Sequence, residues 1–292
     1  MSIKITPDTA GQRLERWLKQ QFPHQPYGTL QKLLRTGQIR IDGHRVKGST
    51  VLEAGQEVRL PPALQKAQDT HTAISLSPTQ HKALKEAVLF EDEDLLALNK
   101  PPGIATQGGT GQKTSMDAQV RAVFGDNLRI VHRLDKGTSG VLLFAKNRAA
   151  AEHLGHQFKK REVQKQYLAL VHGQLPEIDG EIDAPLLKDN KLMMIHPDGL
   201  AAQTRYSVID APEPGYMWLR VWPQTGRMHQ IRAHLAAAGA PIVGDTAYGG
   251  LSLQDCAIPC KRKTFILHAE ALDVMHPRTG KKLVVNAPFT LL

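Results

Sequence analysis

The hydrophobic and polar positions of the first 60 residues follow two periods, that of a helix and then that of a strand. Leu14, Trp17 and Leu18 recur at helical spacing, and leucines within residues 30–34 repeat the pattern. Apolar and polar residues then alternate over residues 39–43, which end in the Asp-Gly pair typical of a two-residue hairpin. The pattern predicts two helices followed by a small hairpin sheet.

Residues 61–83 lack this periodicity and are rich in Pro, Gln, Thr, Ser and His, so we interpret them as a linker. From residue 84 onward the apolar runs continue without a further break. Strand-like runs lie at residues 95–98, 140–145, 167–171, 204–209, 217–222, 265–274 and 282–285. Helix-like runs are fewer and lie at residues 116–124, 148–160 and 228–238.

The strands and helices do not alternate regularly over residues 84–292, which argues against a doubly wound parallel sheet. The pattern instead predicts an α+β fold, in which this second domain is built on a large mixed, mainly antiparallel sheet. A small N-terminal α/β domain at residues 1–60 precedes it.

Composition excludes several classes of protein. No apolar run approaches the ~18–20 residues that a membrane span needs, and the N-terminus lacks the apolar core and cleavage site of a signal peptide. Two cysteines cannot supply a disulfide framework. We therefore expect a cytoplasmic protein that does not contact a membrane.

The charge points to a polyanionic partner. The chain has 37 Lys and Arg against 28 Asp and Glu, a net charge of +9. Residues 1–60 hold ten basic and five acidic residues, so 5 of these 9 positive charges fall in about a fifth of the chain. A protein that is merely basic remains the alternative, but this asymmetry favours a dedicated nucleic-acid-binding module.

Several stretches look like ligand-binding motifs but do not meet the requirements of those motifs. The glycine-rich stretch at 108–114 lacks the G-K-[ST] ending of a phosphate-binding loop, and a surface loop explains it better. Cys256 and Cys260 have no second cysteine pair or histidine at zinc spacing. The acidic run at 91–94 has no partner acid placed by the sequence and is interpreted as a solvated loop. The sequence therefore predicts neither a metal nor a cofactor.

One carboxylate stands out. Asp135 lies in the stretch HRLDKGTSG at residues 132–140, between two strand-like runs and beside the cations Arg133 and Lys136. On this pattern alone, a turn in which Asp135 bonds its own backbone remains the simpler explanation. A nucleophile at the edge of a sheet is the alternative.

The stretch at 132–140 resembles the H-R-L-D-x-x-T-S-G motif of the RluA-type pseudouridine synthases. The family's K-x-Y strand is matched by KQY at 165–167, and its T-G-R-x-H-Q-I-R segment by TGRMHQIR at 225–232. LHA at 267–269 and HPRTG at 276–280 match its C-terminal strands, and we take them as structural. The resemblance looks nearest to the RluC-like branch, which modifies large-subunit ribosomal RNA.

The resemblance implies a role for each matched residue. Asp135 would be the nucleophile, with Arg227 close by to keep its carboxylate ionised and in position. Tyr167 would stack on the target base and help remove its C5 proton. The uridine must first be flipped out of its helix, and Arg133 would fill the vacated place. His132 is counted with Arg133 among the residues that bind RNA.

The N-terminal domain resembles an S4 RNA-binding domain, chiefly through RTGQIRIDG at residues 35–43. In that case its cations would contact phosphates, which strengthens binding without choosing a sequence. The candidates are Arg13, Arg16, Lys32, Arg35, Arg40, Arg45 and Lys47.

The resulting hypothesis is a monomeric RNA pseudouridine synthase that needs no cofactor or metal and acts on large-subunit ribosomal RNA. Transfer RNA is an alternative substrate. A non-catalytic RNA-binding assembly factor and a hydrolase with Asp135 as nucleophile are the alternative functions. The hydrolase is disfavoured because no paired general acid stands at a recognisable spacing.

Overall fold

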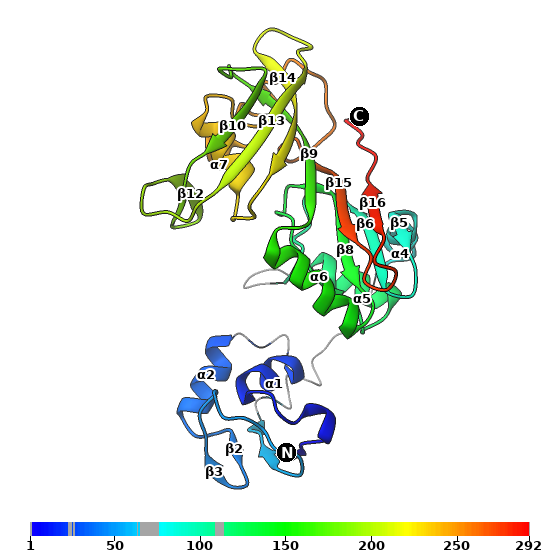
Figure 1. Cartoon of the computed structure of the whole chain (residues 1–292), viewed down its shortest axis with the longest axis vertical. Coiled ribbons are helices and arrows are strands. Elements are labelled where there is room, and N and C mark those ends of the chain that lie inside the picture. Colours follow the sequence, from blue (N-terminus) through cyan, green and yellow to red (C-terminus); the bar gives the residue numbers. More distant parts are fainter. Residues whose placement is uncertain are drawn as a thin grey trace. The chain divides into compact units, whose positions relative to one another are not determined.

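The chain divides into two compact units, Met1–Ser75 and Leu76–Leu292. The structure is a computed structural model that describes residues 2–22, 25, 27–62, 64, 76–108 and 114–291 (Figure 1). Most of the predicted linker, at 63 and 65–75, lies outside these residues, as do residues 109–113 of the glycine-rich stretch.

The first unit has the predicted order of two helices followed by a hairpin sheet. Its elements are β1 (Ser2–Lys4), η1 (Pro7–Thr9), α1 (Leu14–Gln21), α2 (Tyr27–Arg35), β2 (Arg40–Ile41), β3 (His44–Arg45) and β4 (Glu57–Arg59). The strands pair in the order β1-β4-β2-β3. Between β2 and β3, Asp42 and Gly43 have φ values of 48° and 80°. Positive φ at both positions is what a type I′ turn requires, so the predicted hairpin is confirmed.

The core of the first unit is formed by the apolar positions that set the helical pattern. Leu14, Trp17 and Leu18 of α1 are no more than 1% exposed and pack with the leucines of α2 in one cluster. Ile41 of β2 and Val58 of β4 close this cluster from the sheet side. The helical face and the sheet face therefore bury each other, as their periodicities predict.

The second unit contains a long series of strands interrupted by few helices. Its elements up to the ninth strand are α4 (Pro78–Glu86), β5 (Val88–Glu91), β6 (Leu95–Lys100), α5 (Met116–Phe124), β7 (Arg129–Ile130), β8 (Ser139–Ala145), α6 (Arg148–Lys160) and β9 (Gln164–His172). Those that follow are β10 (Asp179–Asp183), β11 (Leu186–Asp189), β12 (Leu192–Ile195), β13 (Gln203–Asp210), β14 (Tyr216–Pro223), α7 (Gln230–Ala237), η2 (Thr246–Tyr248), β15 (Leu267–Met275) and β16 (Lys282–Asn286).

One large sheet organises this unit. Its strands pair in the order β10-β13-β14-β9-β15-β8-β6-β5, with β16 on β15 and β7 on β8. Only β15 and β8 run parallel among the described pairs, and the others are antiparallel. The predicted α+β class with a mixed, mainly antiparallel sheet is confirmed. A separate hairpin, β11–β12, projects beside the sheet (Figure 1).

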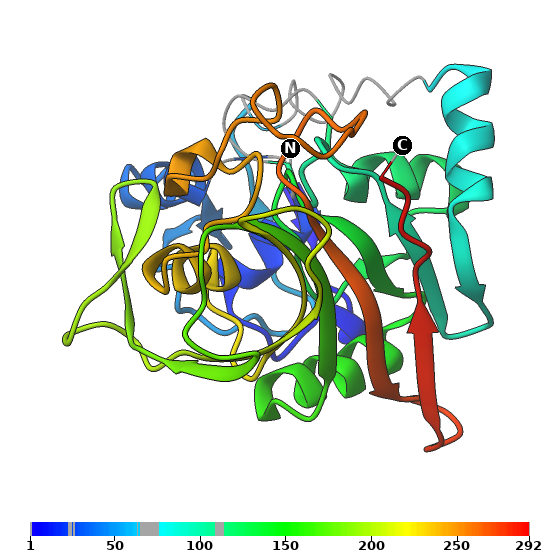
Figure 2. The same ribbon diagram turned by 90° about the horizontal axis from the view of Figure 1, so that it is seen from above.

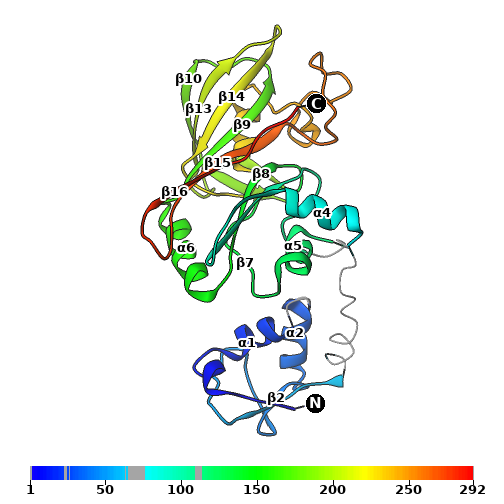
Figure 3. The same ribbon diagram turned by 90° about the vertical axis from the view of Figure 1, so that its right-hand side faces the viewer.

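Helices cover both faces of the half of the sheet that contains β6 and β8. Alternate residues of these strands, such as Leu95 and Leu143, pack with Leu154 of α6. The intervening residues, such as Leu96, pack with Val120 of α5. Figure 3 shows α6 on one side of these strands and α4 and α5 on the other. A strand buried on both faces has no polar alternation, which explains the unbroken apolar run of β8.

In the other half of the sheet, the strands curve around helix α7 (Figure 2). Ile231 and Leu235 of α7 pack on Ala169 of β9 and on Leu219 and Val221 of β14. This packing fixes the rotation of α7 about its axis, and so decides which of its polar side chains point inward.

The end of the predicted linker belongs to the second unit. Helix α4 begins at Pro78, where Ser77 and Gln80 form a capping box, with Ser77 Oγ accepting the Gln80 N–H at 3.2 Å. This S-P-T-Q sequence is a helix-start signal that the linker interpretation overlooked. Strands β1, β5, β10, β11 and β12 were also absent from the prediction. Among the described residues, no helix combines the length and the apolarity that a membrane span requires.

Candidate active site

Asp135 lies in the turn that joins β7 to β8, and the neighbouring loop holds this turn on both sides. Thr106 Oγ1 donates to the Leu134 carbonyl at 2.6 Å and accepts the Leu134 N–H at 3.1 Å. The Gly103 N–H donates to the Lys136 carbonyl at 2.7 Å. With its flanking residues fixed, the Asp135 side chain is 29% exposed. The carboxylate is therefore held in place and reachable from solvent.

Two side chains of the α7 segment approach the same oxygen of Asp135. Arg232 Nη1 lies 3.4 Å from Asp135 Oδ2, and His229 Nε2 lies 3.9 Å from it. Within the described part of the chain, Oδ1 has no polar partner. The carboxylate is thus held through Oδ2, while Oδ1 remains available to a bound molecule.

Arg232 is itself fixed by a buried carboxylate. Its Nε and Nη2 donate to Asp245 at 2.6 and 2.8 Å, and Asp245 is 2% exposed. The guanidinium lies over the rings of Tyr248 at 4.8 Å and Phe265 at 4.5 Å. Burial works to lower the pKa of Arg232, but the bonds to Asp245 and the charge of Asp135 raise it above its ordinary value. The bidentate pair orients the remaining nitrogen toward Asp135.

The predicted contact between Arg227 and Asp135 is wrong. Arg227 Nε donates to the Ala201 carbonyl at 3.1 Å, and its backbone N–H donates to Gln230 Oε1 at 3.0 Å. Since α7 begins only at Gln230, Arg227 lies in the turn before the helix, and among the described residues no hydrogen bond or ion pair joins its side chain to Asp135. Arg232, two residues into the helix and only 8% exposed, takes that place.

Tyr167 of β9 lines the same pocket as Asp135, as the sequence predicts. Its ring packs at the junction of the two hydrophobic clusters that flank the centre of the sheet. Burial, and after it the charge of Asp135, raises the pKa of Tyr167 well above its ordinary value. The phenol is therefore protonated at neutral pH and does not act as a ready base.

The pocket has a volume of about 460 Å³ and a strongly basic wall. That size falls within the usual range for small-molecule sites, roughly 300–1,000 Å³. Besides Arg232, its charged lining consists of Arg133, Arg161, Lys165, Arg227 and Asp135. Asp135 is the one carboxylate among the described lining residues. A second hollow, near Gly215, has only Glu213 as a charged residue and offers no comparable chemistry.

Two lysines to which the sequence analysis gave no role stabilise the site, Lys100 buried and Lys165 half-buried. Lys100 is fully buried, and its Nζ donates to the carbonyls of Pro101 at 2.9 Å and Ile104 at 2.8 Å. Lys165 Nζ donates to the Thr225 carbonyl at 2.9 Å. Burial lowers the pKa of each to about 8. Both ammonium groups tie the loops around Asp135 to the sheet.

Arg133 and His132, the two predicted RNA-binding residues just upstream of Asp135, differ in exposure. Arg133 is exposed at the pocket wall, where a base-replacing side chain would have to be. His132 accepts the Leu143 N–H on Nε2 at 2.9 Å and stacks on Phe158 with centroids 5.1 Å apart. Burial, and after it the charge of Lys165, lowers the pKa of His132 to about 4. His132 is neutral at pH 7, so it supports the fold of the turn besides lining the pocket.

The predicted RNA-binding cations of the first unit are mostly exposed. Arg13, Arg16, Lys32, Arg35, Arg45 and Lys47 are exposed, and Arg40 is half-buried. Arg40 donates to the carbonyls of Gly37 and Gly43, and Arg45 donates to the Thr36 carbonyl. These two arginines therefore also brace the hairpin to which they belong.

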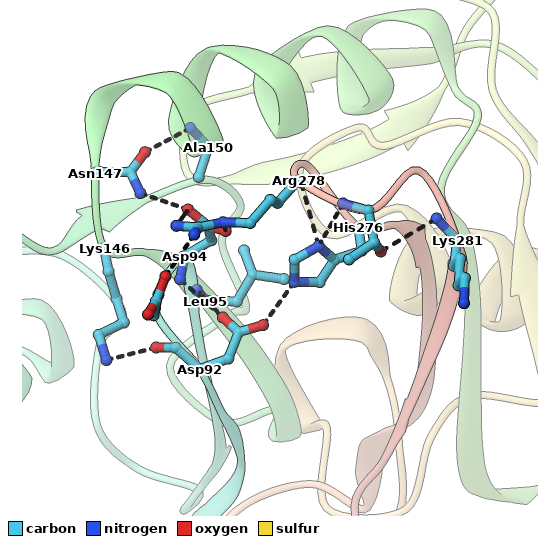
Figure 4. Close-up of polar contacts among 11 residues, drawn as sticks. Asp92, Asp94, Leu95, Lys146, Asn147, Ala150, His276, Arg278 and Lys281 are labelled. Carbon is cyan, nitrogen blue, oxygen red and sulfur yellow. Dashed lines mark hydrogen bonds and ion pairs between the residues drawn. The ribbon is translucent and has the colours of Figure 1, made fainter.

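The acidic run at 91–94 is not a solvated loop, which corrects the interpretation from sequence. Figure 4 shows Asp92 and Asp94 meeting the turn between β15 and β16. His276 Nε2 lies 2.6 Å from Asp92 Oδ2, and Arg278 Nε donates to Asp94 at 2.6 Å. Asp94 also accepts from Asn147 at the start of α6.

The donor atoms of Asp92, Asp94 and His276 lie within 4.8 Å of one another, a spacing compatible with a metal ion. However, His276 Nδ1 accepts the backbone N–H groups of Arg278 and Thr279. Its proton is then on Nε2 and directed at Asp92, so no ring lone pair remains for a cation. Through these polar contacts the cluster joins the turn between β5 and β6, the start of α6 and the turn between β15 and β16.

Comparison with known proteins agrees with this geometry. The family model described as RNA pseudouridylate synthase matches residues 94–237. The "Ribosomal large subunit pseudouridine synthase C" of Vibrio vulnificus is 37% identical over 98% of this chain and 92% of its own length. The protein of the same name from Escherichia coli K12 is 38% identical, again over 98% of this chain and 92% of its own length.

Solved structures show the same fold. Human RNA Pseudouridylate Synthase Domain Containing 1 superposes with a TM-score of 0.59 at 28% identity, covering 73% of this chain and 86% of its own. Human RNA Pseudouridylate Synthase Domain Containing 4 gives a TM-score of 0.59 at 23% identity, with 73% and 92% covered. With relatives aligned over nearly its whole length, and with Asp135 in a basic pocket beside Tyr167, the chain belongs to the RNA pseudouridylate synthase family.

Proposed function

We propose that this protein converts uridines of large-subunit ribosomal RNA to pseudouridine, with Asp135 as the nucleophile. The substrate is inferred from the names of the full-length relatives. The assignment of Asp135 as the nucleophile rests on the contacts of its carboxylate. Arg232 and His229 both approach Oδ2, so Oδ1 is left for the substrate.

The reaction is an isomerisation, so atoms balance within the uridine. Asp135 Oδ1 attacks C1′ or assists loss of the sugar proton, and the C1′–N1 bond breaks with its electron pair on the base. The base rotates, C1′ bonds to C5, and the C5 proton is lost while N1 gains one. Donors on Oδ2 hold the carboxylate in position at the start and stabilise its charge again when it leaves.

Tyr167 would provide a stacking surface for the detached base. Stacking on an aromatic ring contributes roughly 1–3 kcal/mol, which offsets part of the few kcal/mol needed to flip the uridine out. Because its pKa is raised, Tyr167 can pass on the C5 proton only if its own proton leaves first. We therefore assign it stacking as its main task, with the proton step as a secondary one.

The basic groups would bind the RNA backbone. Arg133 would occupy the place vacated by the flipped base, and Arg161, Lys165 and Arg227 would face the flanking phosphates. We propose that the first unit is an S4-type RNA-binding domain that adds further phosphate contacts. Acting on ribosomal RNA, the protein would work in the cytoplasm.

The test is substitution of Asp135 by Asn. We expect pseudouridine formation in a ribosomal RNA transcript to fall below detection, because the amide is not a nucleophile, while RNA affinity stays within a fewfold of wild type. Asp126→Asn is the control, since Asp126 is exposed and does not line the pocket. Activity that survives in the Asp135 variant would disprove the assignment.

Mapping pseudouridines in ribosomal and transfer RNA from cells with and without the protein decides the substrate. Loss of sites from large-subunit RNA alone supports the proposal, and loss from transfer RNA alone moves the substrate there. No change in either RNA would favour a non-catalytic assembly factor.

A further inference from the structure

His229 lies between the carboxylate of Asp135 and the hydroxyl of Tyr248. Its Nε2 is 3.9 Å from Asp135 Oδ2, and its Nδ1 is 3.0 Å from Tyr248 Oη. The ring is largely shielded, with its side chain 20% exposed. Both ring nitrogens therefore have a defined partner.

The backbone of His229 is unusual for its position. It precedes α7 as the N-cap residue with φ 50° and ψ 20°, in the left-handed region, and its side chain makes no capping hydrogen bond. A non-glycine residue held in this region is strained, and such strain clusters at functional sites. Capping therefore does not explain this backbone conformation. We attribute it to the direction that it gives the imidazole, toward Asp135 and Tyr248.

Tyr248 determines which nitrogen of His229 carries the proton. Tyr248 Oη accepts the Met193 N–H of β12 at 2.8 Å. Burial raises the pKa of Tyr248, so the phenol keeps its single proton and can donate it to His229 Nδ1. Burial lowers the pKa of His229 more than Asp135 raises it, which favours the neutral ring. The His229 proton is then on Nε2, the nitrogen that faces the carboxylate.

The opposite tautomer would place a lone pair of Nε2 against the negative oxygen of Asp135. Tyr248 also supports the other group on this oxygen, since its ring lies 4.8 Å from the Arg232 guanidinium carbon. One tyrosine thus contacts both side chains that approach Oδ2.

We propose that His229 is a positioning residue for the nucleophile: its Nε2–H donates to Asp135 Oδ2 in the reacting complex, and the Tyr248 hydroxyl fixes the tautomer that makes this possible. The inference rests on the proposed function of Asp135. The 3.9 Å separation fits a catalytic hydrogen bond that tightens when substrate binds. Arg232 supplies charge on one side of Oδ2, and His229 sets its direction from the other.

The experiment is a single-turnover comparison of His229 and Tyr248 variants in the full-length chain, with RNA affinity measured in parallel. Asn tolerates the left-handed backbone but is too short to reach Asp135, whereas the amide nitrogen of Gln can take the place of Nε2. We expect His229→Asn to slow isomerisation about 10- to 100-fold at unchanged RNA affinity, the range for losing one hydrogen bond to a charged group. His229→Gln should recover most of that loss.

Tyr248→Phe keeps the ring against Arg232 and removes only the hydroxyl. It should slow the reaction about tenfold when residue 229 is His, and have no further effect in the His229→Gln background, because an amide has no tautomer to fix. Tyr216→Phe is the matched control. Its hydroxyl also accepts a backbone N–H, from Ala257 at 3.0 Å, and its ring also contacts a histidine, His172 at 4.8 Å.

A second measurement does not depend on activity. In ¹⁵N-histidine spectra, the signals that disappear in the His229→Gln variant should show a neutral ring protonated on Nε2, and Tyr248→Phe should mix the two tautomers. A ring protonated on Nδ1, equal rates for His229→Asn and wild type, or equal costs of Tyr248→Phe in both backgrounds would each overturn the proposal. If the wild type forms no pseudouridine, the proposed function fails instead, whatever the spectra show.

Discussion

At the scale of single residues, the site depends on charges that are buried together. Arg232 can be nearly buried because Asp245 neutralises it through two short hydrogen bonds, and the nitrogen left over is directed at Asp135. A buried charge without such a partner would be costly. Asp245 therefore acts on the nucleophile through Arg232, although it does not touch it.

His132 shows the other way in which a titratable side chain is accommodated here, which is to remain neutral. Its pKa is lowered to about 4 in the folded protein from an ordinary value of 6.5. Between these two values the unfolded chain binds a proton at His132 that the folded chain does not. The contribution of this residue to the free energy of unfolding therefore falls as pH drops from 6.5 toward 4.

We predict that His132→Gln reduces this acid sensitivity. The amide oxygen of Gln can accept the Leu143 N–H in place of Nε2 and does not titrate. Between pH 7 and pH 5 the wild type should lose about 2 kcal/mol more stability than the variant. Urea unfolding of both proteins at the two pH values measures this difference. Parallel losses would show that His132 is protonated in the folded state.

At the scale of elements, the position of Asp135 depends on how closely β8 approaches β15. These two strands form the parallel pair at the centre of the sheet, with Ala269 opposite Gly140. Gly140 has φ +109°, and a Cβ on it would lie 2.2 Å from the Ala269 carbonyl oxygen. Glycine is required because both the conformation and the space exclude a side chain. The turn that bears Asp135 thus enters the sheet at a point that admits only glycine.

We predict opposite effects for two glycine-to-alanine substitutions. Gly140→Ala should destabilise the protein by more than ~2 kcal/mol, because the obstructing atoms are backbone and cannot move aside. Gly155→Ala should stabilise it by about 0.5–1 kcal/mol, because Gly155 lies inside α6 with nothing within 4 Å of the added Cβ. Thermal melting of both variants is the measurement, and a similar melting temperature for the two would contradict the structure.

At the scale of the whole molecule, the proposed function assigns RNA binding to the first unit and chemistry to the second. The described side chains that contact Asp135 belong to the second unit, whereas residues 1–60 of the first unit contain ten basic and five acidic residues and so hold 5 of the 9 net positive charges. Exposed Lys and Arg side chains bind phosphate groups without distinguishing one RNA sequence from another. RNA affinity and isomerisation rate should then respond to different substitutions.

We predict that replacing Arg16, Lys32 and Arg35 together by Ala weakens RNA binding and makes it less sensitive to salt. If each side chain contacts one phosphate, the slope of log affinity against log salt should become shallower by about 2. The control replaces Lys82, Lys85 and Lys282 of the second unit, which removes the same charge. The proposed S4 role fails if the two triple variants bind alike, while the single-turnover rate at saturating RNA should match wild type in both.

Local patterns in the sequence were enough for the elements that carry their own signals. The bounds of α5 and α6 were predicted to the residue, since Ser115 and Asn147 cap them with hydrogen bonds to backbone N–H groups three residues on. The Asp-Gly hairpin followed from the same kind of local rule. Strand β10 and hairpin β11–β12 were missed because they are short, lie at the edge of the sheet or beside it, and expose much of their surface.

By itself, the sequence determined the fold class and the basic first unit, because these depend on periodicity and charge. Its resemblance to the family implied that Asp135 and Tyr167 share one site. Only the tertiary structure decided which arginine meets Asp135. Arg227 and Arg232 are five residues apart in one motif, and the start of α7 and its rotation against β9 and β14 place Arg232 against Asp135 and Arg227 against the Ala201 carbonyl. Asp245, Tyr248 and His229 become partners of the site for the same reason, since packing brings them together from separate turns.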